Sequence, residues 1–358
     1  RTGGSLTGLA PAWHCLRGGR ALTAGPVPPQ QSQPSSSSAD AESDLLARES
    51  VGASRASSLW VFTHGVLGSG KNWRSFAKRF VTLVEDATGE PQRAILIDSR
   101  NHGKSSGKGG PNLGAGPHTL RSAALDFVRT IQHEVEASSN RLSNAQPKLA
   151  GLVGHSLGGK IVLEYLSEVA MAPRAAGNEV LVPGVTWVLD SIPSSIRANE
   201  LVQDTERVME VVAAVPLEAF DRQAQVMSHL VEAGGLSEPT AMWLCSSLHK
   251  CKDSGALRFA FDLAGCREMF RSFKETDRMD VLRSREVAAQ TAVHLVRGEK
   301  SFRIGDGIYE ELAALGTVQL HTLENAGHWL HVDNPHGLLR MMTEPVSRLR
   351  PPPTKRAA

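Results

Sequence analysis

The sequence predicts an α/β fold, in which a mostly parallel β-sheet lies between helices on both faces and carries a helical cap. The first observation is an alternation of short apolar runs of strand type with stretches whose apolar residues recur at helical spacing. This alternation is typical of βα units with a buried parallel sheet. The second is a break between Asp190 and about Val287, where helical spacing continues without a strand-type run. Such a stretch favours a cap over the carboxyl edge of the sheet, where open α/β sheets bind ligands.

The predicted elements follow one another in a regular order. Strand-type runs cover residues 59–63, 94–97, 149–154, 185–189, 293–296 and 318–323, and helical spacing covers 73–84, 120–135, 161–169 and 335–349. Residues 106–117 are rich in glycine and lysine and are expected to form a loop. The chain then divides into a leader (1–50), a core in two parts (51–190 and 288–350), a helical cap (191–287) and a tail (351–358).

Composition argues against several classes of protein. The 358 residues contain 39 Lys and Arg against 37 Asp and Glu, a net charge of +2. This balance argues against a nucleic-acid partner, which would require a strongly basic face. The four cysteines form no C-x-x-C pair, which argues against a zinc ribbon or a disulfide framework and favours a reduced compartment. No apolar run reaches the length of about 18 residues that would predict a membrane span.

The first residues have the composition of a targeting segment. Residues 1–39 contain no Asp or Glu but include Arg1, Arg17, Arg20 and six serines. A leader of this kind resembles an organelle transit peptide. We therefore expect an organelle, a mitochondrion or a plastid, as the location. The alternative is a low-complexity tail without a targeting signal, and the protein would then be cytoplasmic.

The central motif is Gly154-His155-Ser156-Leu157-Gly158, which follows a strand-type run and precedes a helix. It has the G-x-S-x-G pattern of a nucleophile elbow, a sharp turn that exposes one serine. A side chain two residues on either side of the serine would collide with so tight a turn, which explains the glycines. The following helix directs N–H groups toward negative charge that develops near Ser156. We therefore predict that Ser156 is a nucleophile.

A nucleophilic serine needs a base within hydrogen-bond reach. Of the 13 histidines, His328 lies just after the last strand-type run, late enough to give the chain order nucleophile, acid, histidine. It is therefore the predicted base. His155 adjoins the serine but points elsewhere in an elbow, so it is expected to pack under the turn. His331 and His336 lie near His328, but no carboxylate accompanies them at ligand spacing, and no metal is expected.

Several carboxylates are candidates for the acid that orients the base. Asp190 ends the strand after the elbow unit, and the sheet brings that strand end beside the serine, so Asp190 is preferred. Glu299 and Asp306 follow the penultimate strand, where Ser301 stands at the position in which an aspartate would be sought. Asp262 lies in the predicted cap. Each of these acids also has an ordinary interpretation as a loop carboxylate or a helix N-cap.

The oxyanion of an acyl-transfer reaction needs two fixed N–H donors. Leu157, directly after the serine, is the predicted first donor. Val66, in the turn after the first strand-type run, is the second. His64 begins that turn and is expected to hold it by hydrogen bonds rather than to act as a base.

Two segments also resemble a phosphate-binding loop. Residues 65–71 and 154–160 both read G-x-x-x-x-G-K between a strand and a helix. A phosphate-binding loop of this type requires Ser or Thr next, to bind Mg²⁺. Asn72 and Ile161 occupy those positions, so nucleotide binding is disfavoured.

Four sequence blocks together resemble the α/β-hydrolase superfamily, and within it the branch of small bacterial esterases and their mitochondrial eukaryotic relatives. They are His64-Gly65-Val66-Leu67-Gly68-Ser69, Asp98-x-Arg100-Asn101-His102-Gly103-x-Ser105, Gly154-His155-Ser156-x-Gly158-Gly159-Lys160 and Ala326-Gly327-His328-Trp329. The resemblance covers about residues 55–348 and is poor in the cap. The strands that the family has before Leu59 look short or lost.

The resemblance implies an α/β-hydrolase fold and hydrolysis of carboxylic esters with short or medium acyl groups, without a cofactor. It implies Ser156 as nucleophile and His328 as base. Bacterial relatives take the acid from the strand end that corresponds to Asp190, whereas some eukaryotic assignments use a cap aspartate that would fall at Asp262. The expected partner is a small acyl ester. Thioesterases and acyltransferases use the same residues, and a non-catalytic binding protein on this fold is a further alternative.

Overall fold

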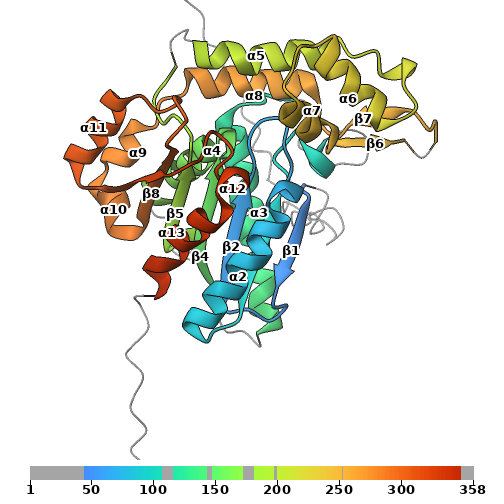
Figure 1. Cartoon of the computed structure of the whole chain (residues 1–358). Coiled ribbons are helices and arrows are strands. Elements are labelled where there is room, and N and C mark those ends of the chain that lie inside the picture. The colour runs from blue at the N-terminus through green and yellow to red at the C-terminus, as the bar shows by residue number, and fades with distance from the viewer. Residues whose placement is uncertain are drawn as a thin grey trace, which may run out of the picture. The chain divides into compact units, whose positions relative to one another are not determined.

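A seven-stranded sheet forms the centre of the protein, with the strand order β1-β3-β2-β4-β5-β8-β9. Figure 1 shows it in a computed structural model, which describes residues 44–106, 116–142, 147–171, 181–196, 200–251 and 253–347. The strands are β1 (Arg48–Gly52), β2 (Ser58–Thr63), β3 (Gln92–Ile97), β4 (Lys148–His155), β5 (Val185–Leu189), β8 (Ala292–Gly298) and β9 (Val318–Leu323). All neighbours are parallel except β1, which is antiparallel to β3. The predicted α/β-hydrolase architecture is therefore confirmed.

Helices cover both faces of this sheet. The helices are α2 (Arg74–Thr88), α3 (Leu120–Arg141), α4 (Leu157–Leu166), α5 (Glu200–Ala213), α6 (Gln223–Glu232), α7 (Glu238–Cys245), α8 (Leu263–Glu275), α9 (Met279–Arg283), α10 (Arg285–Gln290), α11 (Asp306–Leu315), α12 (Leu330–Asp333) and α13 (Pro335–Ser347). Short 3-10 turns occupy Gly70–Trp73, Gly103–Ser105 and Leu217–Ala219, and a π-helical turn occupies Ser167–Met171.

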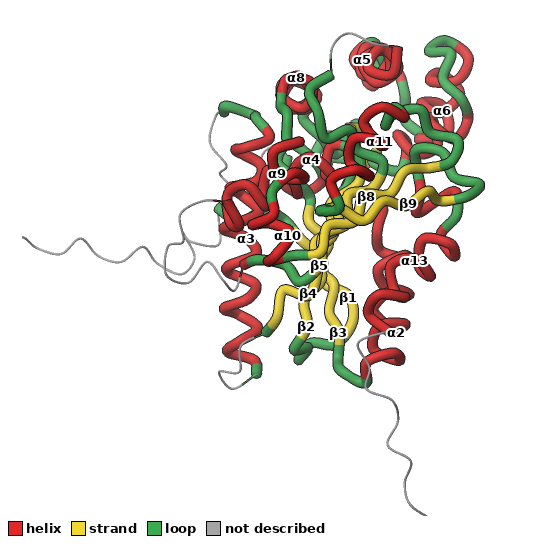
Figure 2. The backbone as a smooth tube through the Cα atoms, turned by 90° about the vertical axis from the view of Figure 1, so that its left-hand side faces the viewer, coloured by secondary structure: helices red, strands yellow, loops and turns green. Residues whose placement is uncertain are grey.

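The alternation of side chains along β2 explains the two faces. Trp60 and Phe62 pack in a cluster with residues of α2 and α13, while Leu59 and Val61 pack in another with residues of α3 and α4. Figure 2 shows α2 and α13 on one side of the sheet and α3 on the other. Because successive residues of a strand point to opposite faces, a strand buried on both faces is apolar throughout. That is why β2 is recognisable as a continuous apolar run.

The edge strand β1 corrects the predicted leader. The leader was expected to reach residue 50 and the strands before Leu59 to be short or lost, but β1 begins at Arg48. An edge strand needs only partial burial, so β1 can begin with three polar residues, and it lacks the apolar run that predicts a strand. The remainder of the leader (1–43) and the tail (351–358) lie outside the described residues, so the transit peptide stays a prediction.

The cap lies between β5 and β8 and contains α5 to α8. Figure 1 shows α5 and α8 above the sheet, with α6 and α7 beside them. The sequence predicted that the cap is helical throughout, and this prediction is wrong. A two-stranded antiparallel hairpin, β6 (Leu248–Lys250) with β7 (Leu257–Phe259), interrupts it. These strands have only three residues each, too few to show an alternation in the sequence.

Lys160 of α4 attaches the cap to the core. Its side chain is fully buried, and its ammonium donates hydrogen bonds to the carbonyl oxygens of Ser194, Phe273 and Thr276 at 2.9, 2.7 and 3.1 Å. Because all three N–H groups have cap acceptors, Lys160 is not free to bind phosphate. The phosphate-loop interpretation of residues 154–160 is therefore wrong.

Strand register brings the predicted site segments together. Thr63 of β2 pairs with Gly154 of β4, so the His64 turn lies beside the elbow. His155 pairs with Leu189 of β5, so the residue after each, Ser156 and Asp190, lies at the same edge. The chain leaves β2 toward β3 and returns to β4 on the other side, which makes a topological switch point. Such points form the ligand crevice of open α/β sheets.

Candidate active site

Ser156 occupies the sharp turn between β4 and α4 with φ 54° and ψ −118°, a conformation that L-residues rarely adopt. A Cβ at Gly154 would lie 2.2 Å from the Gly158 carbonyl oxygen, and one at Gly158 would lie 2.6 Å from the carbonyl oxygen of His64. A Cβ at Gly159 would lie 2.4 Å from the Ser191 side chain. Packing therefore requires all three glycines, of which the sequence pattern predicted Gly154 and Gly158.

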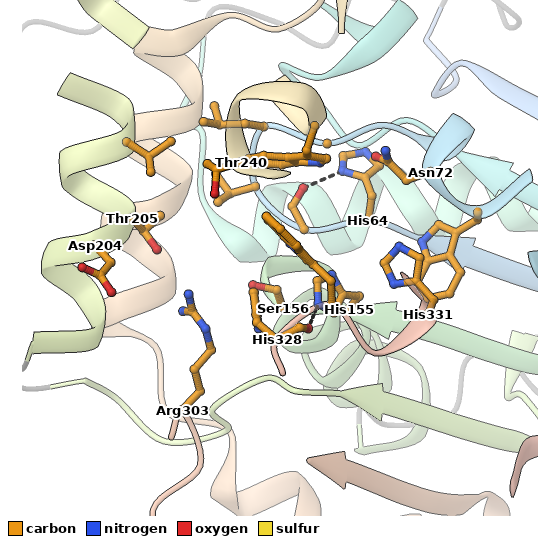
Figure 3. A pocket seen from close by; sticks show the side chains of 18 residues that line it. His64, Asn72, His155, Ser156, Asp204, Thr205, Thr240, Arg303, His328 and His331 are labelled. Carbon is orange, nitrogen blue, oxygen red and sulfur yellow. Dashed lines mark hydrogen bonds between the residues drawn. The ribbon is translucent and has the colours of Figure 1, made fainter. Parts of the chain in front are cut away.

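A pocket of about 350 Å³ opens above Ser156, as Figure 3 shows. Core segments and the cap both contribute to its walls. Its lining includes Ser156, His155, Val66, Arg303 and His328 from the core, and Asp204, Thr205, Thr240 and Trp243 from the cap. A cavity closed by two parts of the chain, with both apolar and polar side chains in its lining, is typical of small-molecule sites.

His328 lies after β9 and is paired with Asp190. Its Nδ1 lies 2.7 Å from Asp190 Oδ2, and the aspartate is 1% exposed. Asp190 accepts two more hydrogen bonds, from Ser301 Oγ at 2.7 Å and from the Gly298 N–H at 3.2 Å. An aspartate held in this way fixes the tautomer of the ring, with the proton on Nδ1. The other nitrogen, Nε2, is then left as an acceptor.

Ser156 and His328 line the same pocket, but their side chains form no hydrogen bond among the interactions of the described residues. Hydrogen bonds of this kind are often long in unliganded enzymes and shorten when substrate binds. The structure thus brings to one pocket two residues that lie far apart in the sequence.

The alternative acids lie elsewhere. Asp262 caps the N-terminus of α8, where its Oδ1 accepts a hydrogen bond from the Ala264 N–H at 3.0 Å. Glu299 accepts from the Asn325 N–H, and Asp306 is paired with Arg297 at the protein surface. None of them contacts His328, and each has the ordinary role that the sequence left open.

Burial favours the uncharged forms of the histidine and the aspartate. It lowers the pKa of His328 well below its usual range, and the positive charge of Arg303 acts in the same direction. Burial raises the pKa of Asp190, against the hydrogen bonds from Ser301 and Gly298 that favour the carboxylate. A neutral imidazole can accept a proton, which a cationic one cannot.

His155 is buried and contacts the loop that carries His328. Its Nε2 lies 2.7 Å from the carbonyl oxygen of His328, and the two rings are 4.6 Å apart. The carbonyl accepts only from an N–H, so His155 carries its proton on Nε2 and holds the backbone of His328 in place. Burial lowers the pKa of His155 to about 3, which keeps it neutral in this role.

The turn after β2 is held by two further histidines. His64 donates from Nδ1 to the Gly65 carbonyl oxygen and accepts at Nε2 from the Ser99 N–H, so it is a structural residue, as expected. His102 accepts at Nε2 from the Leu67 N–H at 3.0 Å. The neighbouring Val66 N–H has no acceptor among the described residues. It is therefore available to a ligand in the pocket.

The block from Asp98 to Ser105 stabilises this turn and does not reach the pocket. Asp98 accepts from the Gly70 and Lys104 N–H groups, at 2.7 and 2.8 Å. Arg100 forms a buried bidentate pair with Asp126 of α3. The sequence identified these residues only as a family signature. Their hydrogen bonds give that signature a physical reason.

Two residues near His328 were missed as functional residues. Ser301 was noticed only because it stood where an aspartate was sought, and it is a hydrogen-bond donor to the acid at Asp190. Arg303 gave no signal in the sequence, yet it lines the pocket. Among the described residues there is no group of three or more His, Cys, Asp or Glu that could hold a metal ion.

Comparison with known proteins identifies the family of this chain. A model of the alpha/beta hydrolase family matches residues 60–341. The chain belongs to this family. The chain is 27% identical over 290 residues to the mouse (Mus musculus) sn-1-specific diacylglycerol lipase ABHD11. The aligned region covers 79% of this chain and 79% of that protein. It is 23% identical over 279 residues to the zebrafish (Danio rerio) protein of the same name, which covers 77% of this chain and 74% of that protein.

Solved structures show the same fold. A marine microorganism esterase superimposes with a TM-score of 0.64 at 19% identity, over 84% of this chain and 98% of its own. E-2-(acetamidomethylene)succinate hydrolase superimposes with a TM-score of 0.59, also at 19% identity, over 84% and 94%. None of the described helices combines the length with the hydropathy that a membrane span requires.

Proposed function

We propose that this protein is a serine hydrolase that cleaves carboxylic esters with short or medium acyl groups, through Ser156, His328 and Asp190. The hydrogen bond from His328 Nδ1 to the buried Asp190 carries the proposal. A buried carboxylate that fixes an imidazole beside a strained serine serves acyl transfer, because it leaves Nε2 free to accept the serine proton. The mouse relative is named as a lipase, a kind of esterase, which supports the same reaction class.

In the proposed mechanism, His328 accepts the Ser156 proton as the serine oxygen attacks the ester carbonyl. The tetrahedral intermediate collapses as His328 returns the proton to the leaving alcohol, which departs and leaves an acyl-enzyme. Water then attacks the acyl-enzyme, with His328 again as the base, and the carboxylic acid is released. Asp190 remains ionised throughout and stabilises the imidazolium that forms.

The oxyanion is proposed to bind two main-chain N–H groups. Leu157 is the first residue of α4, and the first N–H groups of a helix have no acceptor inside it. The Val66 N–H has no acceptor among the described residues, and its turn is fixed by His102. Donors that are fixed before the reaction contribute most, because nothing has to reorient in the transition state.

Hydrolysis of p-nitrophenyl butyrate by the purified chain tests the proposal. We expect steady turnover, and an acyl-enzyme detectable by mass spectrometry when the reaction is quenched with acid. A fluorophosphonate should inhibit the turnover irreversibly. A non-catalytic binding protein would give neither turnover nor an adduct, and that result would reject the proposal. A p-nitrophenyl thioester of the same acyl group measures whether thioesters are better substrates.

The pH dependence of kcat/KM follows from the state of His328. The base must be neutral, and burial with the nearby Arg303 charge lowers its pKa well below 6.5. His331 acts in the same direction, while a hydrogen bond to Asp190 favours the charged form. We therefore expect kcat/KM for a neutral ester to stay level as pH falls from neutrality to 6.5 and to decline only below it. A midpoint at or above pH 6.5 would contradict this prediction.

A further inference from the structure

Arg303 is a cation in the wall of the pocket, and its side chain has no hydrogen-bond or ion-pair partner among the described residues. It belongs to the loop between β8 and α11 and lines the same pocket as Ser156 and His328. Its main-chain N–H donates to Ser301 Oγ, but its guanidinium forms no hydrogen bond or ion pair with any residue that the structure describes. Figure 3 shows it directed toward Asp204 and Thr205, on the other side of Ser156 and His328 from His64.

This arrangement has an energetic cost. Arg303 is partly buried, and burial lowers its pKa. A guanidinium has five N–H donors, and a partly buried one without a protein acceptor has lost part of its hydration without a replacement. An anion that entered the pocket would restore those hydrogen bonds, so the site favours a ligand with negative charge.

Neither of the two nearby carboxylates, Asp190 and Asp204, accepts a hydrogen bond from the Arg303 guanidinium. Both oxygens of Asp190 already accept hydrogen bonds, from Gly298, Ser301 and His328. Asp204 lies on the exposed surface of α5, and it is not within ion-pair distance of Arg303. Its negative charge raises the pKa of the guanidinium without contacting it. The donors of Arg303 therefore remain directed into the cavity.

We propose that Arg303 binds a carboxylate carried by the substrate, so that this site selects anionic esters over neutral ones. The inference rests on the proposed esterase function and adds a substrate class to it. Planar guanidinium donors match a carboxylate in a bidentate way, which gives orientation as well as affinity. Arg303 is a specificity residue in this account, because its contact is with a remote part of the substrate.

The position of Arg303 also sets where the carboxylate lies. In the proposed mechanism the scissile carbonyl lies between Ser156 and the turn that begins at His64. Figure 3 shows Arg303 on the other side of Ser156, near Asp204 and Thr205 of α5. The carboxylate is therefore separated from the reacting carbon by several bonds. It can belong to the acyl half, as in a monoester of a dicarboxylic acid, or to the alcohol half, as in an ester of a hydroxy acid.

Two matched substrate pairs test the proposal and distinguish the halves. The first pair is p-nitrophenyl hexanoate and the p-nitrophenyl monoester of adipic acid, which differ only in a terminal carboxylate on the acyl chain. The second pair is phenyl butyrate and 4-butyryloxybenzoate, which differ in a carboxylate on the alcohol. For each pair, the ratio of kcat/KM for the anionic ester to that for the neutral ester is measured, after subtraction of spontaneous hydrolysis.

We expect Arg303→Gln to lower this ratio about 10- to 100-fold in one of the two pairs, the effect of losing a charge-assisted hydrogen bond. The loss should appear mainly in KM for the anionic ester. Lys300→Gln is the matched control. Lys300 is exposed on the same loop, and its substitution removes the same charge outside the pocket. It should leave both ratios unchanged.

The outcomes separate this inference from the proposed function. If Arg303→Gln slows both members of each pair equally, or changes neither, the ratio is constant and the anionic preference is rejected while esterase activity stands. If Lys300→Gln lowers the ratio as much as Arg303→Gln, general surface charge explains the preference and the inference is also rejected. If the wild-type protein cleaves none of the four esters, the proposed function itself fails.

Discussion

Ser156→Ala is expected to lower kcat for p-nitrophenyl butyrate by about 10⁴- to 10⁶-fold, the cost of removing a serine nucleophile. KM should change little, because alanine leaves the pocket wall and the oxyanion donors in place. Among the described residues, the Ser156 hydroxyl forms no hydrogen bond with the protein, so its removal should not weaken the fold. Steady-state kinetics with a spectrophotometric assay measure the effect.

A serine outside the pocket is the control for this change. Ser254 is exposed in the β6–β7 turn, and Ser254→Ala should keep wild-type kinetics. Circular dichroism and thermal unfolding should be unchanged for both variants. Esterase turnover by Ser156→Ala at the wild-type rate would mean that another group attacks the ester, and the proposed mechanism would be wrong.

Asp190→Asn is expected to lower kcat by about 10³- to 10⁴-fold, because an amide no longer fixes the productive tautomer of His328. The asparagine can donate to Nδ1, and the ring then carries its proton on Nε2, where it cannot accept one from Ser156. The geometry of the pocket is retained, since the two side chains have the same shape. The readout is kcat, with KM expected to change much less.

Asp262→Asn provides the matched control, since it makes the same substitution at the competing acid. Asparagine caps a helix about as well as aspartate, so this variant should be close to wild type in both activity and stability.

The kcat of Ser301→Ala should lie between those of Asp190→Asn and Asp262→Asn, because Asp190 keeps its second donor from Gly298. A large loss at Asp262 with little loss at Asp190 would contradict the assignment.

Most of the core was predictable because its physical causes are local. The strands β2 to β5 are apolar runs buried on both faces, and Gly154 is required by a contact with Gly158, only four residues further on. Gly158 and Gly159 meet His64 and Ser191, which the fold brings from distant parts of the chain. The expectation that Asp190 lies beside Ser156 needed only the order of neighbouring strands, which the pairing of His155 with Leu189 bears out.

The rest depends on contacts that a single sequence does not reveal. Ser301 meets Asp190 across more than a hundred residues, and a serine in a loop has no pattern that predicts such a bond. Arg303 was overlooked because a lone arginine in a loop is usually solvated. Only the fold shows that it lines the pocket together with residues of the cap. The edge strand at Arg48 and the cap hairpin were missed because short, half-exposed strands lack periodicity.

Peptide mapping after fluorophosphonate treatment tests the central claim most directly, because the probe reacts only with an activated nucleophile. We expect one phosphonylated residue, Ser156, in the wild-type protein. Labelling should be slower by orders of magnitude in His328→Ala, since the imidazole is no longer there to accept the proton. Label on a different residue, or equally fast labelling of Ser156 without His328, would contradict it.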